Sequence, residues 1–454
     1  MNRLTRNLKS NRAAMIGATL LVLFYGAALF AGFLAPYSAD REFRDHFFHP
    51  PSKIRIRNER NEFVMPYVAQ TYLIDARKQI YSEGSPISIG FVLPAENRNP
   101  YIAEIVEQDS PLGTIKNKEG KVLQTIFTAK ETGEDTGVFA VKTVMNLPAH
   151  TTGIVVEYGK ISRTLFLKEK TEHEDSPILL LSFERSQEHF PVRFLTHDAK
   201  HRLFGIFPSD LHLFGVDRPG HFFLMGTDQA GRDIFSRVLH GAQISLTVGL
   251  IGVLISTLVG WWVGGIAGYF GGKTDALFMR SAEVLMSIPA LYLVLSVRNI
   301  FPIDLSTKAT YLLMIVVLSL TGWATMARVI RGMVLSLREE EYVLSAKALG
   351  ATSSRILVRH ILPNTAGYVI VRATLLIPVY ILAEVTLSYL GIGIQEPAAS
   401  WGNMLSAAQE LRVLEQFSWV LAPGLFLFLT VLGFNFLGDG LRQSLSVREL
   451  HKPM

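Results

Sequence analysis

Six long apolar runs constrain this chain more than any other feature of its sequence. The first, Ala13–Pro36, contains no charged residue and is long enough as a helix to cross a hydrocarbon core of about 30 Å. The other five fall in the C-terminal half, at Ile244–Phe270, Ala276–Val297, Tyr311–Val334, Ala366–Leu390 and Phe417–Leu437. Because a bilayer admits only segments whose backbone groups are satisfied internally, the sequence predicts an all-α polytopic membrane bundle of six transmembrane helices. A cleaved signal peptide is the alternative for the first run, but the apolar region of such peptides is shorter, about 7–15 residues.

The composition agrees with a membrane protein. Only 18% of the 454 residues are charged, whereas soluble proteins average about 25%. The net charge of +5 would also suit a nucleic-acid-binding protein, but the basic residues stand beside the apolar runs, as the positive-inside rule expects. The predicted partner is therefore the lipid bilayer and not a nucleic acid. The chain holds no cysteine, so disulfides and thiolate chemistry are excluded.

The placement of basic residues predicts the orientation. The segment before the first run carries no acid and four basic residues, Arg3, Arg6, Lys9 and Arg12. This composition is typical of a cytoplasmic N-terminus, and an even number of crossings returns the C-terminus to the same side. The alternation also makes the long polar stretch Leu335–Asn364 cytoplasmic, where its arginines and lysine belong, and it leaves residues about 37–240 outside.

Residues 37–225 differ in kind from the rest. Short runs rich in β-branched or aromatic residues are broken there by Gly, Pro or Asn, a pattern typical of strands, at Tyr101–Val106, Lys121–Phe127, Gly137–Met145 and Gly153–Leu167. The predicted domains are residues 1–36 (the N-terminus and first helix), an inserted β-rich extracytoplasmic domain at 37–225, and a five-helix core at 226–454. His46 and His49 suit loop histidines better than metal ligands, because no HExxH-like spacing accompanies them.

The stretch 335–364 carries the functional argument. Two short helical patterns flank Gly350, and Pro363 is expected to close the second. Gly350 can supply the positive φ that other residues resist, which predicts a compact helix–glycine–helix element between two spans. An ordinary amphipathic loop at the membrane interface is the alternative.

This stretch resembles the EAA coupling loop of binding-protein-dependent ABC importer permeases. The family pattern is Glu-Ala-Ala, three residues, Gly, nine residues and Ile-x-Leu-Pro. Gly350 and the pair Leu362 and Pro363 match it, while the Glu-Ala-Ala positions hold Leu344, Ser345 and Ala346 and the Ile position holds His360. The resemblance implies an ATPase-coupling site made of Glu341, Leu344, Ser345, Ala346, Gly350, His360, Leu362 and Pro363.

Three further stretches resemble the dipeptide/oligopeptide branch of that family. Leu224–Leu246 contains Gly-Thr-Asp-x-x-Gly-Arg-Asp, Leu387–Leu405 contains Ser-Tyr-Leu-Gly-Ile-Gly and Ser-Trp-Gly-Asn-Met-Leu, and Phe434–Arg442 closes the core. With the first helix included, the chain is most similar to the C-type permease subunit, but its external domain is far longer than that subunit's usual loop.

The resemblance implies the pore-forming permease subunit of an ATP-driven importer of peptides or similar small solutes in the bacterial cytoplasmic (inner) membrane. The partners it implies are a second permease, two cytoplasmic ATPases and an extracytoplasmic solute-binding protein. The stretch Gly268–Thr274 ends like a phosphate-binding loop, but Ala267 stands where that motif needs its first glycine. ATP hydrolysis is therefore expected in the partners and not in this chain.

Two residue sets within the predicted spans call for an explanation. Gly260, Gly264 and Gly268 lie four residues apart, and such small-residue faces let membrane helices approach closely, either inside this bundle or against a second subunit. Glu283 and Glu384 are carboxylates at membrane depth, where ionisable groups usually serve a function. They are expected to line the pathway or contact another subunit, or else to reach the membrane interface from a helix end.

Other classes of protein fit the sequence less well. A secondary transporter needs its own coupling-ion site, usually in repeated halves, and no such repeat is evident. A receptor or anchor that acts through its external domain does not need five further spans. No catalytic triad, metal-ligand cluster or cofactor motif supports a membrane enzyme, so no catalytic residue, metal or cofactor is predicted.

Overall fold

The computed structural model describes most of the helical regions and parts of the strand-rich region. The described residues are 10–44, 46–57, 61–69, 71–75, 80–82, 86–92, 101–108, 114–117, 138–145, 153–158, 161–172, 178–185, 189–203, 207–218, 220–289 and 306–449, with a few isolated positions besides. They form two compact units. The first comprises Met1–Pro51, Arg193–Gly215 and Phe223–Met454, and the second comprises Ser52–Val192 and Val216–Phe222. Residues 37–51 and most of 193–215 thus group with the helices, whereas the sequence assigned them to the inserted domain.

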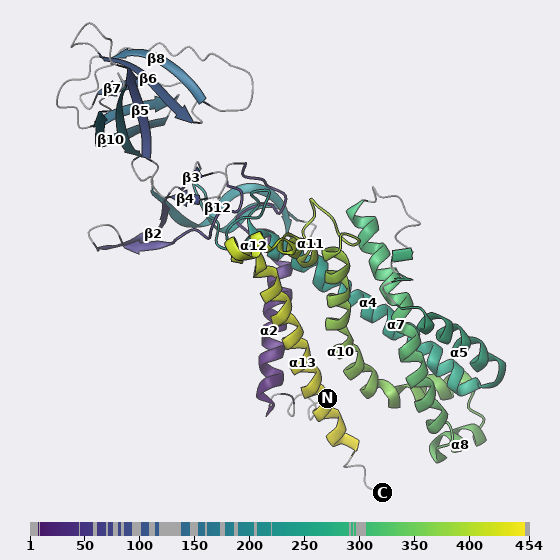
Figure 1. The fold of residues 1–454 in the computed structure, drawn as a ribbon. Coiled ribbons are helices and arrows are strands. Elements are labelled where there is room, and N and C mark those ends of the chain that lie inside the picture. The colour runs from purple at the N-terminus through teal and green to yellow at the C-terminus, as the bar shows by residue number, and fades with distance from the viewer. Residues whose placement is uncertain are drawn as a thin grey trace. The chain divides into compact units, whose positions relative to one another are not determined.

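The first unit is a helical bundle (Figure 1). Its five long helices are α2 (Arg12–Leu29), α4 (Ile234–Phe270), α7 (Thr307–Leu337), α10 (Leu362–Tyr389) and α13 (Ala422–Glu449). Each of them, α10 and α13 with their flanking turns, is long and apolar enough to cross a membrane. The remaining predicted span, Ala276–Val297, is only partly described. Helix α5 (Gly272–Ser287) is its described portion, and the rest lies largely outside the described residues.

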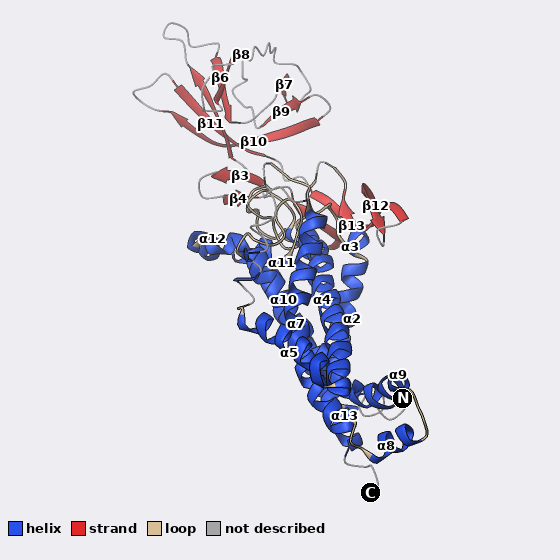
Figure 2. Ribbon diagram, turned by 90° about the vertical axis from the view of Figure 1, so that its right-hand side faces the viewer, coloured by secondary structure: helices blue, strands red, loops and turns tan. Residues whose placement is uncertain are grey.

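Short helices connect and terminate the long ones. They are α3 (Ala31–Leu34), α8 (Glu341–Ala348), α9 (Ser353–Arg355), the π-helical turn η1 (Ile356–Ile361), α11 (Trp401–Ser406), the 3₁₀ turn η2 (Ala407–Gln409), α12 (Leu411–Gln416) and the 3₁₀ turn η3 (Ser418–Leu421). Helix α8 lies at the end of the bundle where α2 begins and α13 ends (Figures 1 and 2). Helices α2 and α13 meet there through a hydrogen bond from Asn11 Nδ2 to Gln443 Oε1, 3.0 Å long.

Apolar side chains from α4, α7 and α10 fill the centre of the bundle. Leu246 and Ile381 are fully buried there, with Ile315 and Leu318 of α7 packed in the same cluster. Helix α2 closes one side, where the ring centroids of Phe24 and Phe426 lie 5.5 Å apart. The packing therefore joins the N-terminal helix to the C-terminal core as one body.

The second unit is built mainly of antiparallel strands, red in Figure 2. Strand β2 (Phe63–Ala69) lies between β1 (Arg55–Arg57) and the start of β12 (His189–Leu203), with His189 opposite Ala69. A hairpin joins β3 (Tyr72–Asp75) and β4 (Ile80–Ser82). Beyond the second unit, β12 continues in the first unit, where it pairs with β13 (Phe207–Val216).

A seven-stranded sheet makes up the rest of the second unit. Its members are β5 (Pro86–Val92), β6 (Tyr101–Gln108), β7 (Thr114–Asn117), β8 (Val138–Met145), β9 (Gly153–Tyr158), β10 (Ile161–Glu172) and β11 (Ile178–Arg185), in the order β7-β9-β10-β11-β5-β6-β8. Two predicted strands coincide with β6 and β8, and the predicted run Gly153–Leu167 divides between β9 and β10. The predicted strand Lys121–Phe127 lies outside the described residues.

Candidate functional site

Helix α8 forms a small projecting element between α7 and α10. Val343, the buried residue of α8, packs in one apolar cluster with Ile330 and Val334 of α7 and with Leu357 of η1. On the adjoining side, Asn364 Nδ2 donates a hydrogen bond of 3.0 Å to the Tyr342 hydroxyl oxygen. One buried side chain and one polar contact thus hold α8 in place and leave most of its surface free.

Gly350 turns the chain at the end of α8. Its N–H donates to the Lys347 carbonyl at 3.0 Å, and the N–H of Ala351 donates to the Ala346 carbonyl at 3.1 Å. These two bonds make a Schellman cap, which places the residue after the helix in the left-handed region, and Gly350 has a φ of +81°. A Cβ added to Gly350 would meet no atom within 4 Å, so the requirement for glycine lies in the backbone conformation and not in space.

Pro363 does not close a second short helix, and that prediction was wrong. Helix α9 leads through η1 directly into α10, and Pro363 lies in the first turn of α10. Proline has no backbone N–H to donate, and its ring disfavours the regular α conformation in the turn before it. The preceding turn is widened instead, with the Leu362 N–H donating to the Leu357 carbonyl five residues back, a π-type bond.

The predicted coupling residues divide between surface and core. Glu341, Leu344, Ser345 and Gly350 are exposed, Ala346 and His360 are partly buried, and Leu362 is buried. Leu349, which was not among the predicted coupling residues, is 89% exposed although it is a large apolar residue. Its position directly before the glycine turn was the available signal.

The glycine face of α4 packs against α7 of the same chain. A Cβ added to Gly260 would lie 2.6 Å from the Trp323 carbonyl oxygen, and one added to Gly268 would lie 2.8 Å from that of Arg331. A Cβ on Gly264 would collide with the Ala327 carbonyl oxygen. The structure therefore places this face inside the bundle and not on its outer surface.

The two carboxylates in the predicted spans differ in their surroundings. Glu384 of α10 is fully buried, and its Oε1 accepts a hydrogen bond of 2.8 Å from Ser388, whose Oγ in turn accepts one of 3.0 Å from the Ile394 N–H. Glu283 of α5 has a side chain that is 63% exposed and lies 3.9 Å from Arg328 Nη2 of α7. Glu384 thus belongs to the interior of this chain, whereas Glu283 lies on its surface.

The Gly-Thr-Asp-x-x-Gly-Arg-Asp stretch forms a largely buried polar network, a role that was not predicted from the sequence. Asp228 Oδ2 accepts from Arg232 Nε at 2.8 Å, and Arg237 Nη2 donates to both carboxylate oxygens of Glu396 at 2.9 and 3.1 Å. Arg232 also contacts Glu396. The Arg237 side chain is only 1% exposed, so this network ties the loop after α10 to the start of α4.

Asp233 ends the same stretch as the N-cap of α4. Its Oδ2 accepts from the Ser236 N–H at 2.8 Å and from Ser236 Oγ at 2.6 Å. Burial raises the pKa of this carboxyl from 3.8 to about 7, partly offset by the bonds from Ser236. Helix α4 begins here because this cap satisfies the Ser236 N–H, which has no partner within the helix.

Two alternative sites are not supported among the described residues. His46 and His49 are buried with ring centroids 5.2 Å apart, and burial, followed by the neighbouring His49, lowers the pKa of His46 to about 4. No group of three metal-ligating side chains occurs in this described part of the chain. The phosphate-loop-like stretch forms the end of α4 and the start of α5, with Gly271 at a φ of +64° between them.

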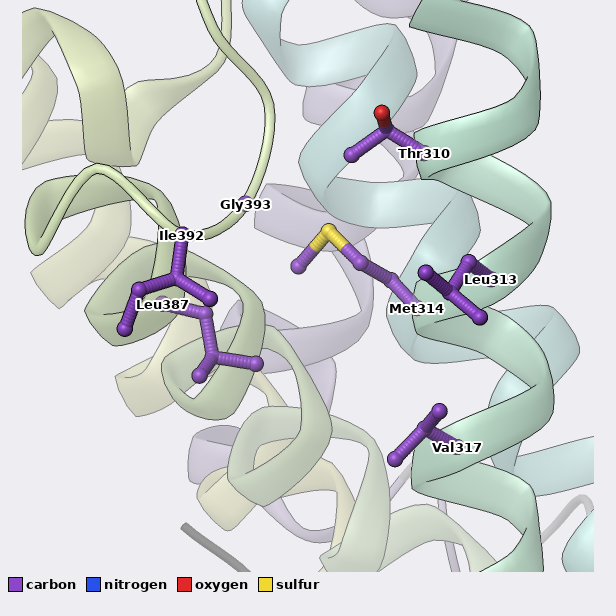
Figure 3. Close-up of a pocket in the computed structure, with 7 residues that line it drawn as sticks. All are labelled: Thr310, Leu313, Met314, Val317, Leu387, Ile392 and Gly393. Atoms are coloured by element: carbon purple, nitrogen blue, oxygen red, sulfur yellow. The ribbon is translucent and has the colours of Figure 1, made fainter. Parts of the chain in front are cut away.

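A shallow apolar pocket lies where α7 meets the end of α10. It encloses about 310 Å³, a volume that includes space open to its surroundings. Figure 3 shows Met314 and Val317 of α7 on one side, with Leu387 and Ile392 facing them. The same face of α7 continues beyond Val317 toward Arg328.

The apolar spanning helices and the short helix–glycine turn between two of them define a multi-pass membrane permease. Comparisons with known proteins agree. Residues 234–449 match the family of binding-protein-dependent transport system inner membrane components, and residues 2–51 match the N-terminal transmembrane domain of oligopeptide transport permease C. The chain belongs to this family of C-type oligopeptide permeases.

Curated relatives include permeases named for oligopeptides and for dipeptides. The oligopeptide permease OppC of Bacillus subtilis is 42% identical over 241 residues, which cover 52% of this chain and 76% of the relative. The dipeptide permease DppC of the same organism is 44% identical over 225 residues, covering 50% and 68%. OppC of Escherichia coli is 42% identical over 231 residues, covering 51% and 73%. Residues 52–233 lie outside both family matches.

Proposed function

We propose that this chain forms half of the translocation pathway of an ATP-driven peptide importer and couples to ATPases through α8. In this proposal a second permease supplies the other half, two cytoplasmic ATPases supply the energy, and an external binding protein delivers the solute. The chain belongs to a binding-protein-dependent transport family, and relatives named as oligopeptide and dipeptide permeases favour peptides as the solute.

The observation that carries the coupling role is the projecting α8–Gly350 element. It combines a rigid attachment, through Val343 and the bond between Asn364 and Tyr342, with an outward surface that includes exposed Leu344 and Leu349. A rigidly attached helix with an apolar outer face suits insertion into a groove of a partner. Closure of the ATPase dimer on ATP would draw two such elements together, rock the permease bundles and open the pathway toward the loaded binding protein.

The proposed orientation places α8 and both termini in the cytoplasm. The start of α2, the end of α13 and α8 share one end of the bundle (Figures 1 and 2). The segment that leads into α2 and the stretch 335–364 are both rich in basic residues in the sequence, as cytoplasmic loops are.

Reconstituted uptake tests this function. The chain is co-expressed with a second permease, ATPases and a binding protein from the same organism and placed in proteoliposomes with a radiolabelled tripeptide. We expect accumulation that requires ATP on the ATPase side and the binding protein on the other. Accumulation driven by a proton gradient without ATP would instead identify a secondary transporter.

We also propose that the seven-stranded sheet helps to position the binding protein. The sheet lies within residues 52–233, which neither family match covers, as expected of an addition to the common transport core. Pro86 at the start of β5 pairs with Glu184 near the end of β11, so Pro86–Arg185 can be replaced by a short linker without separating the flanking ends. We expect the excised protein to insert normally and to take up solute more slowly at limiting binding protein. Unchanged uptake under those conditions would remove the positioning role.

A further inference from the structure

The exposed surface of α5 divides into two different stripes. One is apolar and contains Leu277 and Val284, which are seven residues apart and strongly exposed. The other, called the polar stripe, combines charged residues with small ones. Its exposed residues follow the spacing i, i+4, i+7 and i+11, namely Ala276, Arg280, Glu283 and Ser287. An α-helix repeats every 3.6 residues, so the two stripes face directions that differ by roughly a quarter turn. An apolar stripe suits lipid, whereas the polar stripe needs a different neighbour.

Helix α7 carries a matching polar stripe in its second half. Thr321, Thr325, Arg328 and Gly332 follow the same spacing, and all but Thr321, which is half-buried, are exposed. A Cβ added to Gly332 would meet no atom within 4 Å, so no described residue covers that position. On another side of α7, exposed Val316 and Leu320 resemble the lipid-facing stripe of α5.

Arg328 and Glu283 join the two stripes. Arg328 Nη2 lies 3.9 Å from Glu283 Oε1, and the two side chains are 50% and 63% exposed. This distance is longer than a direct hydrogen bond between charged groups, about 2.7–2.9 Å. Both groups therefore retain free hydrogen-bonding capacity toward a third molecule.

The pair lies more than two helical turns from the start of α5 and from the end of α7. At a rise of 1.5 Å per residue, Glu283 is about 16 Å along α5 from Gly272, and Arg328 is about 13 Å from the end of α7 at Leu337. Ionisable side chains at membrane depth face the bundle interior or a water-filled cavity. Because these two are exposed on the surface of their own bundle, the cavity must lie beside this face of α5 and α7.

We propose that the two stripes form one wall of the aqueous route for the solute, and that Arg328 and Glu283 contact the carboxylate and ammonium groups of a zwitterionic peptide. This inference rests on the proposed transport function and assigns a solute-contacting site within it. Toward the far end of α7, the same face enters the apolar contact of Met314 and Val317 with Leu387 (Figure 3). The polar stripe of α7 thus ends where apolar side chains of α7 and α10 pack together.

A permanent interface with the second permease accounts for this face less well. The centres of protein interfaces are depleted in charged residues. The stripes carry Arg280 as well as the pair, with threonine, serine and glycine between them. A wall that water and a charged solute pass along needs this composition.

Cysteine accessibility tests the wall directly, since the chain has no cysteine of its own. Ser287→Cys and Thr325→Cys are placed on the polar stripes, with Leu277→Cys and Val316→Cys as lipid-facing controls. Each variant is assembled into the full importer and treated with a charged, membrane-impermeant thiol reagent, which reacts with hydrated thiolates. We expect the stripe positions to react at least about tenfold faster than the controls, because the controls lack water, and saturating trialanine to slow that reaction.

Substrate preference tests the charged pair. Arg328→Gln is compared with the parent for uptake of trialanine and of its C-terminal amide, with the same binding protein throughout. We expect the parental preference for the free carboxylate to fall about tenfold, the effect of one lost charge-assisted hydrogen bond, mainly through KM. Glu283→Gln should lower the preference for a free over an acetylated amino terminus in the same way. Equal changes for free and blocked peptides would mean that the pair only holds α5 to α7, and would overturn the solute contact.

The outcomes separate this inference from the transport function. Unreactive Ser287→Cys and Thr325→Cys in a complex that still takes up peptide with ATP would overturn the wall and leave the proposed function standing. Disulfide crosslinks from these positions to cysteines in the second permease, formed throughout the transport cycle, would likewise assign the face to a subunit interface. A parent complex that shows no ATP-driven uptake marks failure of the proposed function itself.

Discussion

At the scale of single residues, three glycines decide how closely α4 and α7 can approach. A Cβ at Gly260, Gly264 or Gly268 would run into the carbonyl oxygen or Cβ of a residue on α7. Membrane helices associate without a hydrophobic driving force, so close van der Waals packing supplies much of their attraction. The close packing of α4 against α7 therefore depends on the absence of side chains at these three positions.

The close packing of α4 against α7 can be tested by adding a single methyl group. Gly264→Ala should destabilise the purified protein by roughly 1–3 kcal/mol, the usual cost of overpacking, and lower its Tm in detergent. Gly26→Ala in α2 is the control, because nothing lies within 4 Å of a Cβ there, and alanine is the better helix former by about 1 kcal/mol. Equal Tm values for the two variants would mean that the helices separate easily at Gly264.

Asp233 makes stability depend on pH. Its carboxyl has a pKa of about 7 in the folded protein, raised by burial from 3.8. Between these two values the folded state keeps the proton and the unfolded state has lost it. The stabilisation from this group is therefore fully present below about pH 4 and is lost as the pH rises through 7.

Asp233→Asn should flatten that dependence. Asparagine also caps helices well, so α4 should still begin at the same place. The Tm of the parent should fall more between pH 5 and pH 8 than the Tm of the variant. Parallel Tm curves for the two proteins would show that Asp233 stays ionised across this range.

At the scale of elements, α8 is attached to the bundle through Val343 and Tyr342, and a strongly exposed apolar residue follows it. Leu349 is 89% exposed directly before the turn at Gly350. Leu349→Asp should leave the fold of this chain unchanged but lower the amount of ATPase that co-purifies with it by about tenfold, since it puts a charge into an apolar contact. Leu344→Glu, which restores the acid of the family's coupling loop, should be tolerated. ATPase recovered in full with Leu349→Asp would place the contact elsewhere.

The sequence predicted some elements well and others poorly, for physical reasons. Five of the six apolar runs and the turn at Gly350 appear in the structure, because they depend on local composition and conformation. The continuity from α9 into α10 was missed, because the sequence does not reveal that a π-type bond at Leu362 absorbs the strain before Pro363. The polar network of Asp228, Arg237 and Glu396 was also not predicted, because only tertiary packing brings its members together.

At the scale of the whole molecule, the chain combines a permease bundle with an additional strand-rich unit. The family matches cover the bundle and not residues 52–233. Helix α8, the start of α2 and the end of α13 share one end of the bundle, so one orientation in the membrane fixes all three.

Reporter fusions test this orientation. A fusion of alkaline phosphatase after Lys130 should be active, because that enzyme folds outside the cytoplasm, whereas fusions after Ser354 and at the C-terminus should be inactive. Fusions of a cytoplasmic fluorescent reporter at the same sites should give the opposite pattern. A cytoplasmic signal at Lys130 would overturn the orientation.

The most direct test of ATP coupling through α8 is peptide uptake by importers that carry Gly350→Val or Gly350→Asn. Gly350 has a φ of +81° and open space around it, so the two variants differ mainly in their tolerance of that backbone conformation. Asparagine adopts it readily, whereas a β-branched residue pays about 1 kcal/mol or more, which displaces the turn. Both variants should insert and pair with the second permease. Gly350→Asn should keep its ATPases and its uptake, and Gly350→Val should lose uptake. Uptake at the parental rate by Gly350→Val, with its ATPases bound, would contradict coupling through this element.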